Sequence, residues 1–439
     1  MTAMESVTLT KTQVKRLGAD AFVFGFPLLL MTATMREAIG DGSGENGNRF
    51  NRFAHLRHFP DPSIRTIVAA NADTLYSLAW LDLVREPALL ELPETGGRSY
   101  LMPLLDAWTN VFASLTPRTV GANGATLAIA GPGWTGEIPE GARRIEAPTN
   151  NAWGIFHLHA HGHGDLDASR TIQGQLTLAP LSLAGVATGT EDGLLEPLPQ
   201  AHRLVMEMGA RQFLAELATQ MGINPPAPVD LPMLDRLAEI GLRPGKSFNW
   251  SALSEDTREG LATGLEEGKE MVTTQSASEA EAGWQVLHTG AGSYGNDYLR
   301  RARIANFALG INRPEDAIFP LSTTDADGHQ LSGTHRYVLR FEPDALPPVD
   351  GIWSLAVYDM DQLLVSNSIG RYALGSRNEL DFASDGSLEI AVQHEPPDSS
   401  HANWLPAPEH DFYLMLHLYW PSESVLDGSW TAPPIRRIT

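Results

Sequence analysis

The stretch TLYSLAWLDL, residues 74–83, is a short apolar run preceded by turn-forming residues, and it sets the pattern for the first half of the chain. Similar runs surround it: SIRTIVAAN (63–71), SYLMPLLDAWTNVFASL (99–115), ATLAIAGPGW (125–134) and WGIFHLHAHG (153–162). Short apolar runs separated by Gly, Pro and Asn are typical of an antiparallel sandwich or barrel. A parallel α/β sheet would need helical periods between the strands, and none occurs here. We therefore predict a first β-sandwich module over residues 46–195.

The same texture returns near the C-terminus. Four further strands are predicted, in HRYVLRFEP (335–343), IWSLAVYDMD (352–361), SLEIAVQHEP (387–396) and DFYLMLHLYW (411–420). The dipeptides Asp327-Gly328 and Asp385-Gly386 are typical of hairpin turns. We predict a second antiparallel β-sandwich module over residues 326–439.

Between these modules the apolar period becomes helical, which predicts a helical region over residues 196–325. Helices are expected over 201–223, over 252–272 with Ser254 as N-cap, and over 296–312. The fold class is therefore mainly β with α: two antiparallel β-sandwiches, a helical insert and an N-terminal helix. A chain of 439 residues is also too long for one ordinary core.

Residues 1–45 are predicted to be an N-terminal helical segment, with one helix over 10–40 that breaks near Pro27. Its apolar run, Ala21 to Thr32, is too short to span a bilayer and lacks the cleavage site of a secretory signal. We interpret it as a buried helix of the mature protein, which favours a cytoplasmic location.

Charge and composition limit the classes of partner. The chain has 53 acidic and 31 basic side chains, for a formal net charge of −22. A surface with this much negative charge repels the phosphates of nucleic acids and of anionic membranes. We therefore expect neither nucleic-acid nor membrane binding. There is no cysteine, which leaves nitrogen and oxygen ligands for any metal. A homo-oligomer is expected from base rates alone.

Four histidines alternate along one predicted strand: His157, His159, His161 and His163. Imidazoles at i and i+2 point to the same face of a strand and can converge on one zinc, manganese or iron ion. The best pairs are His157 with His159, or His159 with His161. Candidates for a third ligand are His288, His335, His394, His401 and His417. The alternative interpretation is a polar strand edge that is rich in imidazole.

Two other stretches concentrate polar side chains within predicted strands. NADTLYSLAWLDL (71–83) contains Asn71, Asp73 and Tyr76, and LLDAWTNVFASLTPRTVG (104–121) contains Asp106, Trp108, Asn110 and Arg118. Such groups are costly to bury unless they are paired, so they form either a ligand site or an internal hydrogen-bond network. If both aspartates line one cleft, Asp73 and Asp106 are the candidates for general acid and base.

Several common motifs are missing from the sequence. GPGWTG (131–136) lacks the lysine of a phosphate loop, and there is no G-x-S-x-G elbow, H-E-x-x-H or dinucleotide fingerprint. TTDADGHQLSG (323–333) has Asp325 and Asp327 at the spacing of a calcium loop but no glutamate at its twelfth position, so we predict a hairpin turn.

The chain resembles a bacterial family with two domains in tandem. The stretches NADTLYSLAWLDL, RSYLMPLLDAWTNVFASLTPRTVG and GPGWTG resemble domain of unknown function 1254. The stretches LPPVDGIWSLAVYDMDQLLVSNSIGRYALGSR, DGSLEIAVQHEPP, NWLPAP and LYWP resemble its usual partner, domain of unknown function 1214. The helical YGNDYLRRARIANFALGINRPEDAIFP is similar to the segment that joins them, and the likeness runs from about residue 19 to 434.

The resemblance implies two jelly-roll-like β-sandwiches and no general catalytic assignment. It marks the family's polar motifs at Asn71, Asp73, Tyr76, Asp106, Trp108, Asn110, Arg118, Trp353, Tyr358, Asn367, Arg371, Tyr372, Asn403 and Trp404. Many relatives carry export signals, so a periplasmic location is the alternative. Relatives often have arginine where this chain has His417, which suggests either that His417 is the third ligand of a metal site on the histidine strand or that the replacement is an unrelated surface change.

Three functions stay open at this point. The leading one is a hydrolase or lyase that acts on a small polar or polyhydroxylated substrate in an aromatic-lined cleft, with possible help from a histidine-bound metal. Asp73, Asp106 and Arg118 would be catalytic, and Asn71, Tyr76, Trp108, Asn110, Arg371 and Tyr372 would bind the substrate. The alternatives are a lectin-like ligand-binding protein that uses the same cleft, and a structural protein whose polar motifs are internal networks.

Overall fold

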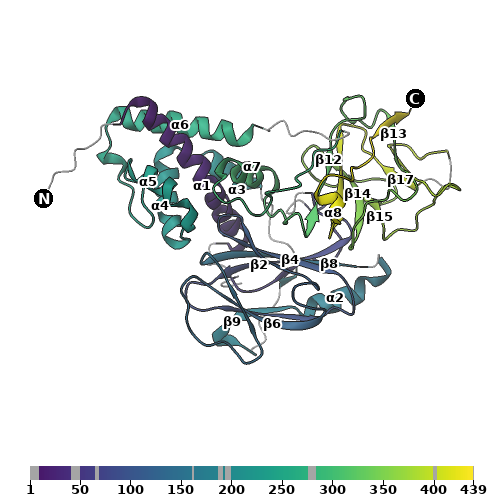
Figure 1. Ribbon diagram of the computed structural model, residues 1–439, viewed down its shortest axis with the longest axis horizontal. Coiled ribbons are helices and arrows are strands. Elements are labelled where there is room, and N and C mark those ends of the chain that lie inside the picture. Colours follow the sequence, from purple (N-terminus) through teal and green to yellow (C-terminus); the bar gives the residue numbers. More distant parts are fainter. Residues whose placement is uncertain are drawn as a thin grey trace.

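The structure is a computed structural model. It describes residues 9–40, 50–64, 69–160, 163–185, 191–192, 199–274, 283–398 and 403–438. The chain forms three parts, which Figure 1 shows together: a helical part at the upper left, one β module below and a second β module at the upper right. The sheets are antiparallel or mixed, so the predicted class, mainly β with α and with an N-terminal helix, is confirmed.

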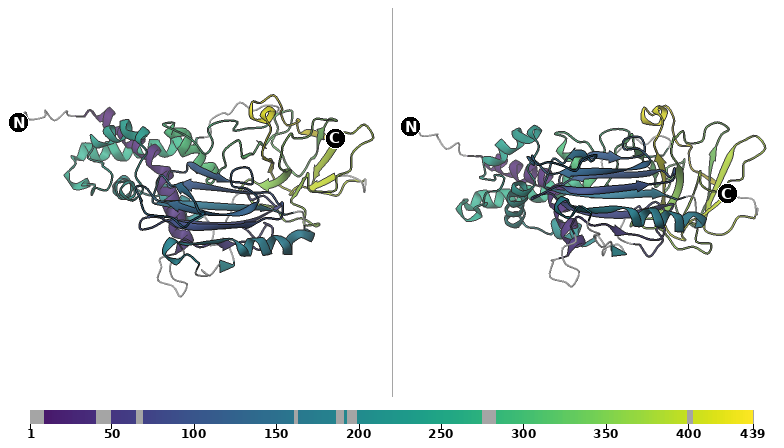
Figure 2. Two further views of the ribbon diagram at one scale, coloured as in Figure 1. Left: turned by 60° about the horizontal axis from the view of Figure 1, so that its bottom comes forward. Right: turned by 90° about the horizontal axis from the view of Figure 1, so that it is seen from below.

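The first β module consists of two sheets that share a core. The strands are β1 (Ala54–His55), β2 (Thr74–Asp82), β3 (Ala88–Glu94), β4 (Tyr100–Asp106), β5 (Val111–Leu115), β6 (Asn123–Ala130), β7 (Arg143–Glu146), β8 (Asn151–His159), β9 (Thr177–Pro180) and β10 (Glu191–Asp192), and helix α2 (Leu166–Gln175) follows β8. One sheet has the order β10-β1-β2-β8-β4-β5 and the other β7-β6-β3-β9. Leu75 and Phe156 of the first sheet and Leu90 and Leu127 of the second belong to one buried cluster. The long strands run between the helical part and the second module (Figure 2).

The second β module repeats this arrangement. Its elements are β11 (Ala317–Ile318), β12 (Leu321–Ser322), β13 (Arg336–Phe341), β14 (Trp353–Asp359), β15 (Ala373–Gly375), β16 (Leu388–Gln393), β17 (Asn403–Pro406), β18 (Phe412–Tyr419), α8 (Glu423–Leu426) and β19 (Arg436–Ile438). The sheets have the orders β11-β18-β14-β15, with β12 also paired to β18, and β17-β16-β13-β19. Both contribute to one apolar core that includes Leu355, Leu416, Leu339 and Ile390. The jelly-roll connectivity of the two modules stays a prediction.

The helical part surrounds α1 (Lys11–Ile39). The other helices are α3 (Pro199–Met206), α4 (Ala210–Ile223), α5 (Leu231–Ala238), α6 (Glu255–Thr273) and α7 (Tyr298–Ala308). Thr10 caps α1 by accepting a hydrogen bond from the backbone N–H of Gln13, and the Gln13 side chain accepts one from the backbone N–H of Thr10. Ser254 caps α6, as predicted, by accepting a hydrogen bond from the backbone N–H of Thr257.

Helix α1 is continuous through Pro27, so the predicted break does not occur. Proline removes one backbone donor, but the residues around it are buried in the core of the helical part, and the helix continues to Ile39. Taken whole, α1 also has the length and composition of a membrane span, which the shorter run 21–32 did not suggest. In the structure, 89% of its most apolar window is buried inside the protein.

Three sequence-based boundaries need correction. The helix predicted over 201–223 is two helices, because Gly209 takes an extended conformation at the N-cap of α4. The second module begins before residue 326, because β11 and β12 already pair with β18. The strand predicted over 63–71 is absent from the described part of that stretch, and residues 65–68 lie outside the described residues.

Helices α1 and α6 are in unusually close contact at glycines. A Cβ atom added to Gly264 would lie 1.9 Å from the backbone oxygen of Lys15 and 3.0 Å from the backbone nitrogen of Ala19. Since these atoms belong to the backbone of α1, the helices would have to separate. We expect Gly264→Ala to destabilise the protein by about 1–3 kcal/mol, as overpacked cores do.

Urea unfolding would measure this effect. The matched control is Gly174→Ala, in the exposed part of α2, where the nearest atom to an added Cβ is 3.8 Å away. That variant should be neutral or slightly more stable, because alanine favours a helix by roughly 0.5–1 kcal/mol over glycine. Equal midpoints for the two variants would show that the glycine contact does not limit the approach of α1 and α6.

Candidate functional site

Strand β18 has two chemically different faces. Its leucines at positions 414, 416 and 418 enter the core of the second module. The alternate residues Tyr413, Met415, His417 and Tyr419 face the other way and line a cavity. Successive side chains of a strand point to opposite faces. In YLMLHLY the leucines therefore share the face in the module core, and the tyrosines, the methionine and the histidine share the face outside it.

Strands β2 and β8 of the first module present a second face to the same cavity. Tyr76, Leu78 and Trp80 alternate along β2, and Trp153, Ile155 and His157 alternate along β8. Tyr76 lies opposite His157, and Trp80 lies opposite Trp153, in the antiparallel ladder. The two indole rings stack at 5.0 Å with an interplanar angle of 1°, and the Tyr76 and His157 rings are 4.7 Å apart.

Helix α7 closes a third side of the cavity. Arg300, Arg303, Ile304, Phe307 and Ala308 line it, and their spacing of three or four residues places them on one helix face. The cavity has a volume of about 880 Å³ and is mostly apolar. Its apolar and aromatic lining residues include Leu78, Trp80, Trp153, Ile155, Phe307, Leu309, Phe319, Leu321 and Met415.

Several buried polar atoms of this lining lack a hydrogen-bond partner within the described part of the chain. They are both ring nitrogens of His157, Nδ1 of His417, the hydroxyl of Tyr413, the indole nitrogen of Trp153 and the amide oxygen of Asn312. Buried polar groups are nearly always paired, so an unpaired group needs an explanation. Five such side chains therefore lie around one cavity, although the unpaired atoms themselves are buried beneath its surface.

The histidines of the site are neutral at ordinary pH. Burial, together with the neighbouring His417, lowers the pKa of His157 to about 3. Burial likewise lowers the pKa of His417 to about 3. A neutral imidazole has one donor nitrogen and one acceptor nitrogen, so each ring brings both hydrogen-bonding capacities without a charge.

Two tyrosines beside the histidines are oriented by Asn71. The backbone N–H of Asn71 donates to the hydroxyl oxygen of Tyr76 at 2.9 Å, and its side-chain amide donates to that of Tyr419 at 3.4 Å. Burial raises the pKa of Tyr419 to about 12 and that of Tyr76 well above its ordinary value. Both phenols are therefore protonated. Asn71 was predicted to bind the substrate, and it instead supports Tyr76, which does line the cavity.

The predicted histidine metal site is only partly assembled. His157 and His417, which were predicted to share a metal site, line the same cavity. The ring of His159 packs against that of Tyr419, with 4.4 Å between the ring centres. Within the described residues, these three imidazoles do not form a group whose ligand atoms all lie within 4.8 Å of one another. His161 lies outside the described residues. A metal at this position stays a prediction.

The alternative interpretation of the histidine strand, a polar edge, is wrong. Strand β8 pairs with β2 on one side and β4 on the other, so it is an interior strand. His157 and His159 are 7% and 0% exposed. Burial, together with His157 and Arg377, lowers the pKa of His159 to about 3.

The structure does not bring Asp73 and Asp106 together, so the predicted acid–base pair is wrong. Thr74, which follows Asp73, lies opposite His159, whereas Asp106 lies opposite Ala152 at the other end of β8. Seven residues of strand separate these positions, or roughly 23 Å at 3.3 Å per residue. Neither aspartate lines the cavity.

Asp106 and its neighbours form a structural turn. One Asp106 carboxylate oxygen accepts hydrogen bonds from the backbone N–H groups of Trp108 and Asn110, and the Asn110 amide donates to the other at 3.0 Å. Burial raises the pKa of Asp106 to about 6, although these hydrogen bonds and Arg301 oppose the shift. The Trp108 ring packs on Phe24 of α1. These residues thus hold β4 against the helical part. They form an internal hydrogen-bond network, which was one of the two predicted alternatives.

The remaining predicted residues also lie away from the cavity. Arg118 donates to the backbone oxygen of Glu315 at 2.9 Å and lies over the Trp420 ring, so it joins the two modules at their surface. Arg371 donates to the backbone oxygen of Trp404 inside the second module. Tyr372 packs at the edge of a small cluster of that module. None of the three lines the cavity.

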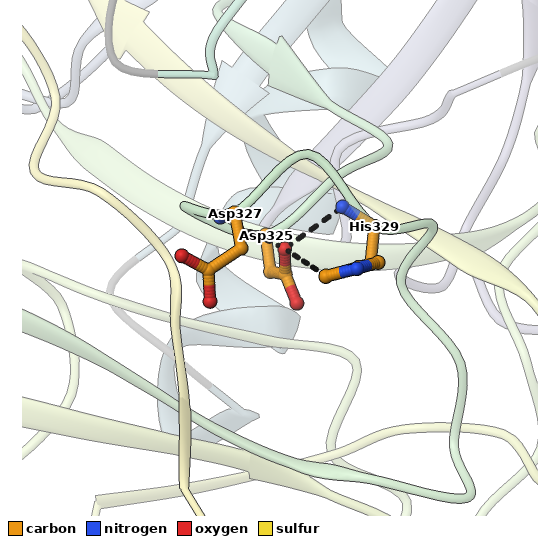
Figure 3. Close-up of side chains that lie close together, drawn as sticks. All are labelled: Asp325, Asp327 and His329. Atoms are coloured by element: carbon orange, nitrogen blue, oxygen red, sulfur yellow. Dashed lines mark hydrogen bonds and ion pairs between the residues drawn. The ribbon is translucent and has the colours of Figure 1, made fainter.

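The Asp325 stretch forms the predicted hairpin turn. The Asp325 carboxylate accepts hydrogen bonds from the backbone N–H groups of Asp327 and His329, and Gly328 has a φ of 83° (Figure 3). The three side chains bring ligand-type atoms within 4.8 Å of one another. Because one oxygen of this carboxylate accepts both hydrogen bonds of the turn, local structure explains why the three residues lie together.

The arrangement defines a class: a two-module β protein with a helical part and a large, mostly apolar cavity to which all three parts contribute. Residues 50–180 match the family model described as Protein of unknown function (DUF1254), and residues 316–423 match Protein of unknown function (DUF1214). The chain therefore belongs to the tandem family that joins these two domains, in the predicted order.

Solved structures support the fold. The VPA0106 protein from Vibrio parahaemolyticus is similar over 97% of this chain and 100% of its own, with a TM-score of 0.72 and 21% sequence identity. An uncharacterised protein from Burkholderia cenocepacia aligns over 98% of this chain and 95% of its own, with 12% identity and a TM-score of 0.47, which is too low to support a shared fold. No curated protein matches the sequence.

Proposed function

We propose that this protein binds a small molecule with a mostly apolar body in the cavity between β2, β8, β18 and α7. The observation that supports the proposal best is the cavity itself, which has a volume of about 880 Å³ and is lined by mostly apolar side chains of both modules and α7, with His157 and His417 among them. A few convergent polar groups in a large apolar cavity are the usual composition of a small-molecule site.

The size and lining of the cavity support the ligand class. A volume of about 880 Å³ lies within the range of ligand sites, roughly 300–1,000 Å³. The stacked Trp80 and Trp153 rings and the Phe319 ring offer flat apolar surfaces. They favour an aromatic or aliphatic body over the polyhydroxylated molecule that the sequence suggested.

Ligand binding was the alternative to catalysis in the sequence analysis. The hydrolase or lyase prediction no longer has the paired carboxylates on which it depended, because Asp73 and Asp106 are far apart. Neutral histidines and protonated tyrosines can bind and orient a ligand without chemistry. Catalysis therefore stays a prediction, and we propose ligand binding as the function.

Filling the cavity should abolish binding. Ala308 lines the cavity on α7, so Ala308→Phe places a ring inside it. We expect an uncharged apolar fluorophore, N-phenyl-1-naphthylamine, to bind the parent at one site and the variant at least about tenfold more weakly, a change of about 1.4 kcal/mol. Fluorescence titration measures both affinities.

The matched control is Ala262→Phe, an exposed position of α6. It introduces the same side chain into a helix of the same part of the protein without entering the cavity, and it should leave the affinity unchanged. Equal affinities of the parent and Ala308→Phe, with folding intact by circular dichroism, would contradict the proposal.

A further inference from the structure

The lining of the cavity changes character along α7. Arg300 and Arg303 line it in the first turns of the helix, whereas Ile304, Phe307 and Ala308 line it further along. Residues three or four apart share one helix face, so this face is cationic where the helix starts and apolar where it ends. At 1.5 Å per residue, roughly 8–12 Å of helix separate the two arginines from Ala308.

The apolar end of α7 meets the first β module. Leu309, which follows the helix, packs against the cluster that contains the stacked rings of Trp80 and Trp153. A Cβ atom added to the next residue, Gly310, would lie 3.3 Å from the Trp153 ring. Both tryptophans are buried. The end of α7 therefore lies against the inner, aromatic end of the cavity.

The cationic end of α7 is the open end. Asp297 and Arg300, at the start of the helix, are exposed although they line the cavity, and Arg303 is half-buried. Side chains that are both exposed and part of the lining lie where the cavity meets solvent. A molecule inside the cavity can therefore reach the arginines at the mouth while its other end lies beside the tryptophans.

Both guanidinium groups at the mouth have free donors. Nε of Arg303 donates to the backbone oxygen of Met271 at 2.9 Å, which holds the side chain and leaves its two Nη groups without a partner in the described part of the chain. The Arg300 guanidinium lies against Gly290, where an added Cβ atom would be 2.5 Å from Nη1. It forms no hydrogen bond or ion pair with the described residues. Two such arginines are unusual in a chain with 53 acidic side chains.

Asp297 is the acidic side chain of this lining, and it has a local role. Its Oδ1 accepts a hydrogen bond from the backbone N–H of Arg300 at 3.1 Å, which caps α7. The charged lining side chains are therefore two guanidinium groups and one carboxylate, for a net charge of +1. This local excess of positive charge stands in a protein whose formal net charge is −22.

The charges behind the lining do not cancel this excess at the mouth. The Asp359 carboxylate, which acts on Tyr413, accepts hydrogen bonds from two backbone N–H groups of its own turn, each at 2.9 Å. At the histidine end, Asp73 and Arg377 carry opposite charges and act on each other. None of these three charged side chains lines the cavity.

We propose that the ligand is an amphipathic carboxylate. Arg300 and Arg303 bind its carboxylate at the mouth, and its apolar body lies along α7 toward Trp80 and Trp153. The inference rests on the proposed function and names the ligand class. The donors of a guanidinium match the two oxygens of a carboxylate, and the first turn of a helix favours negative charge. A single negative charge also balances the net charge of the lining.

Two competitors with the same tail, decanoate and 1-decanol, test the inference by displacing N-phenyl-1-naphthylamine. In Arg300→Met/Arg303→Met we expect the affinity for decanoate to fall about tenfold, because charge-assisted hydrogen bonds to its head group are lost. The affinity for decanol should change less than about twofold, since an alcohol carries no charge for the arginines to bind. Retained decanol binding also shows that the cavity of the variant is intact.

The matched control is Arg211→Met/Arg243→Met. It removes two charges from exposed positions of the helical part that do not line the cavity, and it should keep the parent affinity for decanoate. Equal losses for decanoate and decanol in the Arg300 and Arg303 variant, or no loss for decanoate, would overturn the inference and leave the proposed function in place. Failure of the fluorophore to bind the parent would overturn the proposed function and this inference with it.

Discussion

Lowering the pH from 6.5 to 5 should destabilise the protein by several kcal/mol. The buried imidazoles of His157, His159 and His417 have pKa values lowered to about 3, chiefly by burial. In the unfolded chain they return to about 6.5. Between pH 6.5 and pH 3 the unfolded chain thus binds more protons than the native protein. The stability of the native protein therefore falls as the pH falls.

The expected size follows from these shifts. Each histidine contributes a loss of about 2 kcal/mol over this pH interval, at 1.36 kcal/mol per pKa unit. Asp106 acts in the opposite sense, because burial raises its pKa to about 6 and the native carboxyl holds a proton that the unfolded chain releases. One aspartate, with a smaller shift, offsets only part of the effect of three histidines.

Unfolding free energies from urea titrations at several pH values measure this slope. The His157→Asn/His417→Gln double variant should lose most of the slope between pH 6.5 and 5, because two of its three causes are gone. The matched control is His410→Asn, at an exposed histidine, which should keep the parent slope. A parent protein with the same stability at both pH values would contradict the burial of neutral imidazoles.

Replacing Arg301 by methionine should cost about 3–5 kcal/mol, the usual cost of removing one partner from a buried set of charges. Arg301 is 2% exposed and lies over the rings of Phe24, Trp108 and Tyr298, at 5.5, 5.1 and 5.3 Å. Its charge favours the ionised forms of buried Asp106 and Asp230. Without it, both carboxyl groups are buried with no cation beside them.

Urea unfolding of two further variants checks the cause. Arg300→Met removes the same charge from an exposed neighbouring position and should change stability by less than about 0.5 kcal/mol. Arg301→Met/Asp230→Asn should recover part of the loss, since one of the uncompensated carboxylates is gone. A loss below about 1 kcal/mol for Arg301→Met would show that the guanidinium does not hold α7, and with it one wall of the cavity, in place.

The fold could be predicted in outline from local patterns. Short apolar runs between Gly, Pro and Asn predicted the strands, and caps such as Ser254 predicted helix starts. The break between α3 and α4 was missed because Glu207, Met208 and Gly209 do not interrupt the helical apolar pattern. The continuity of α1 through Pro27 was missed because it depends on burial by other helices, which no local pattern contains.

The site was only half predicted. Tyr76, His157 and His417 were named as candidates, and all three line the cavity. Asp106 and Arg118 were misleading, because their residue types suit a catalytic pair. In the structure the Asp106 carboxylate orders a turn and Arg118 lies at the junction of the two modules. The α7 face and Phe319 were missed, since only the tertiary fold brings them to β8 and β18.

One feature of the sequence could have located more of the site. In YLMLHLY (413–419), leucine alternates with tyrosine, methionine and histidine, so one face of the strand is purely aliphatic and the other mixed. A strand at the surface of one module that carries tyrosine and histidine on its outer face indicates contact with a second module or a ligand. Tyr413 and Tyr419 could have been added to the candidates on that basis.

The central claim is that the cavity between β2, β8, β18 and α7 is a ligand site, and its most direct test is a crystal structure with 6-bromo-2-naphthol. The account predicts an anomalous bromine peak inside the cavity, among Trp80, Trp153 and Phe319. Bromine peaks only at the protein surface, in crystals saturated with the probe, would contradict it.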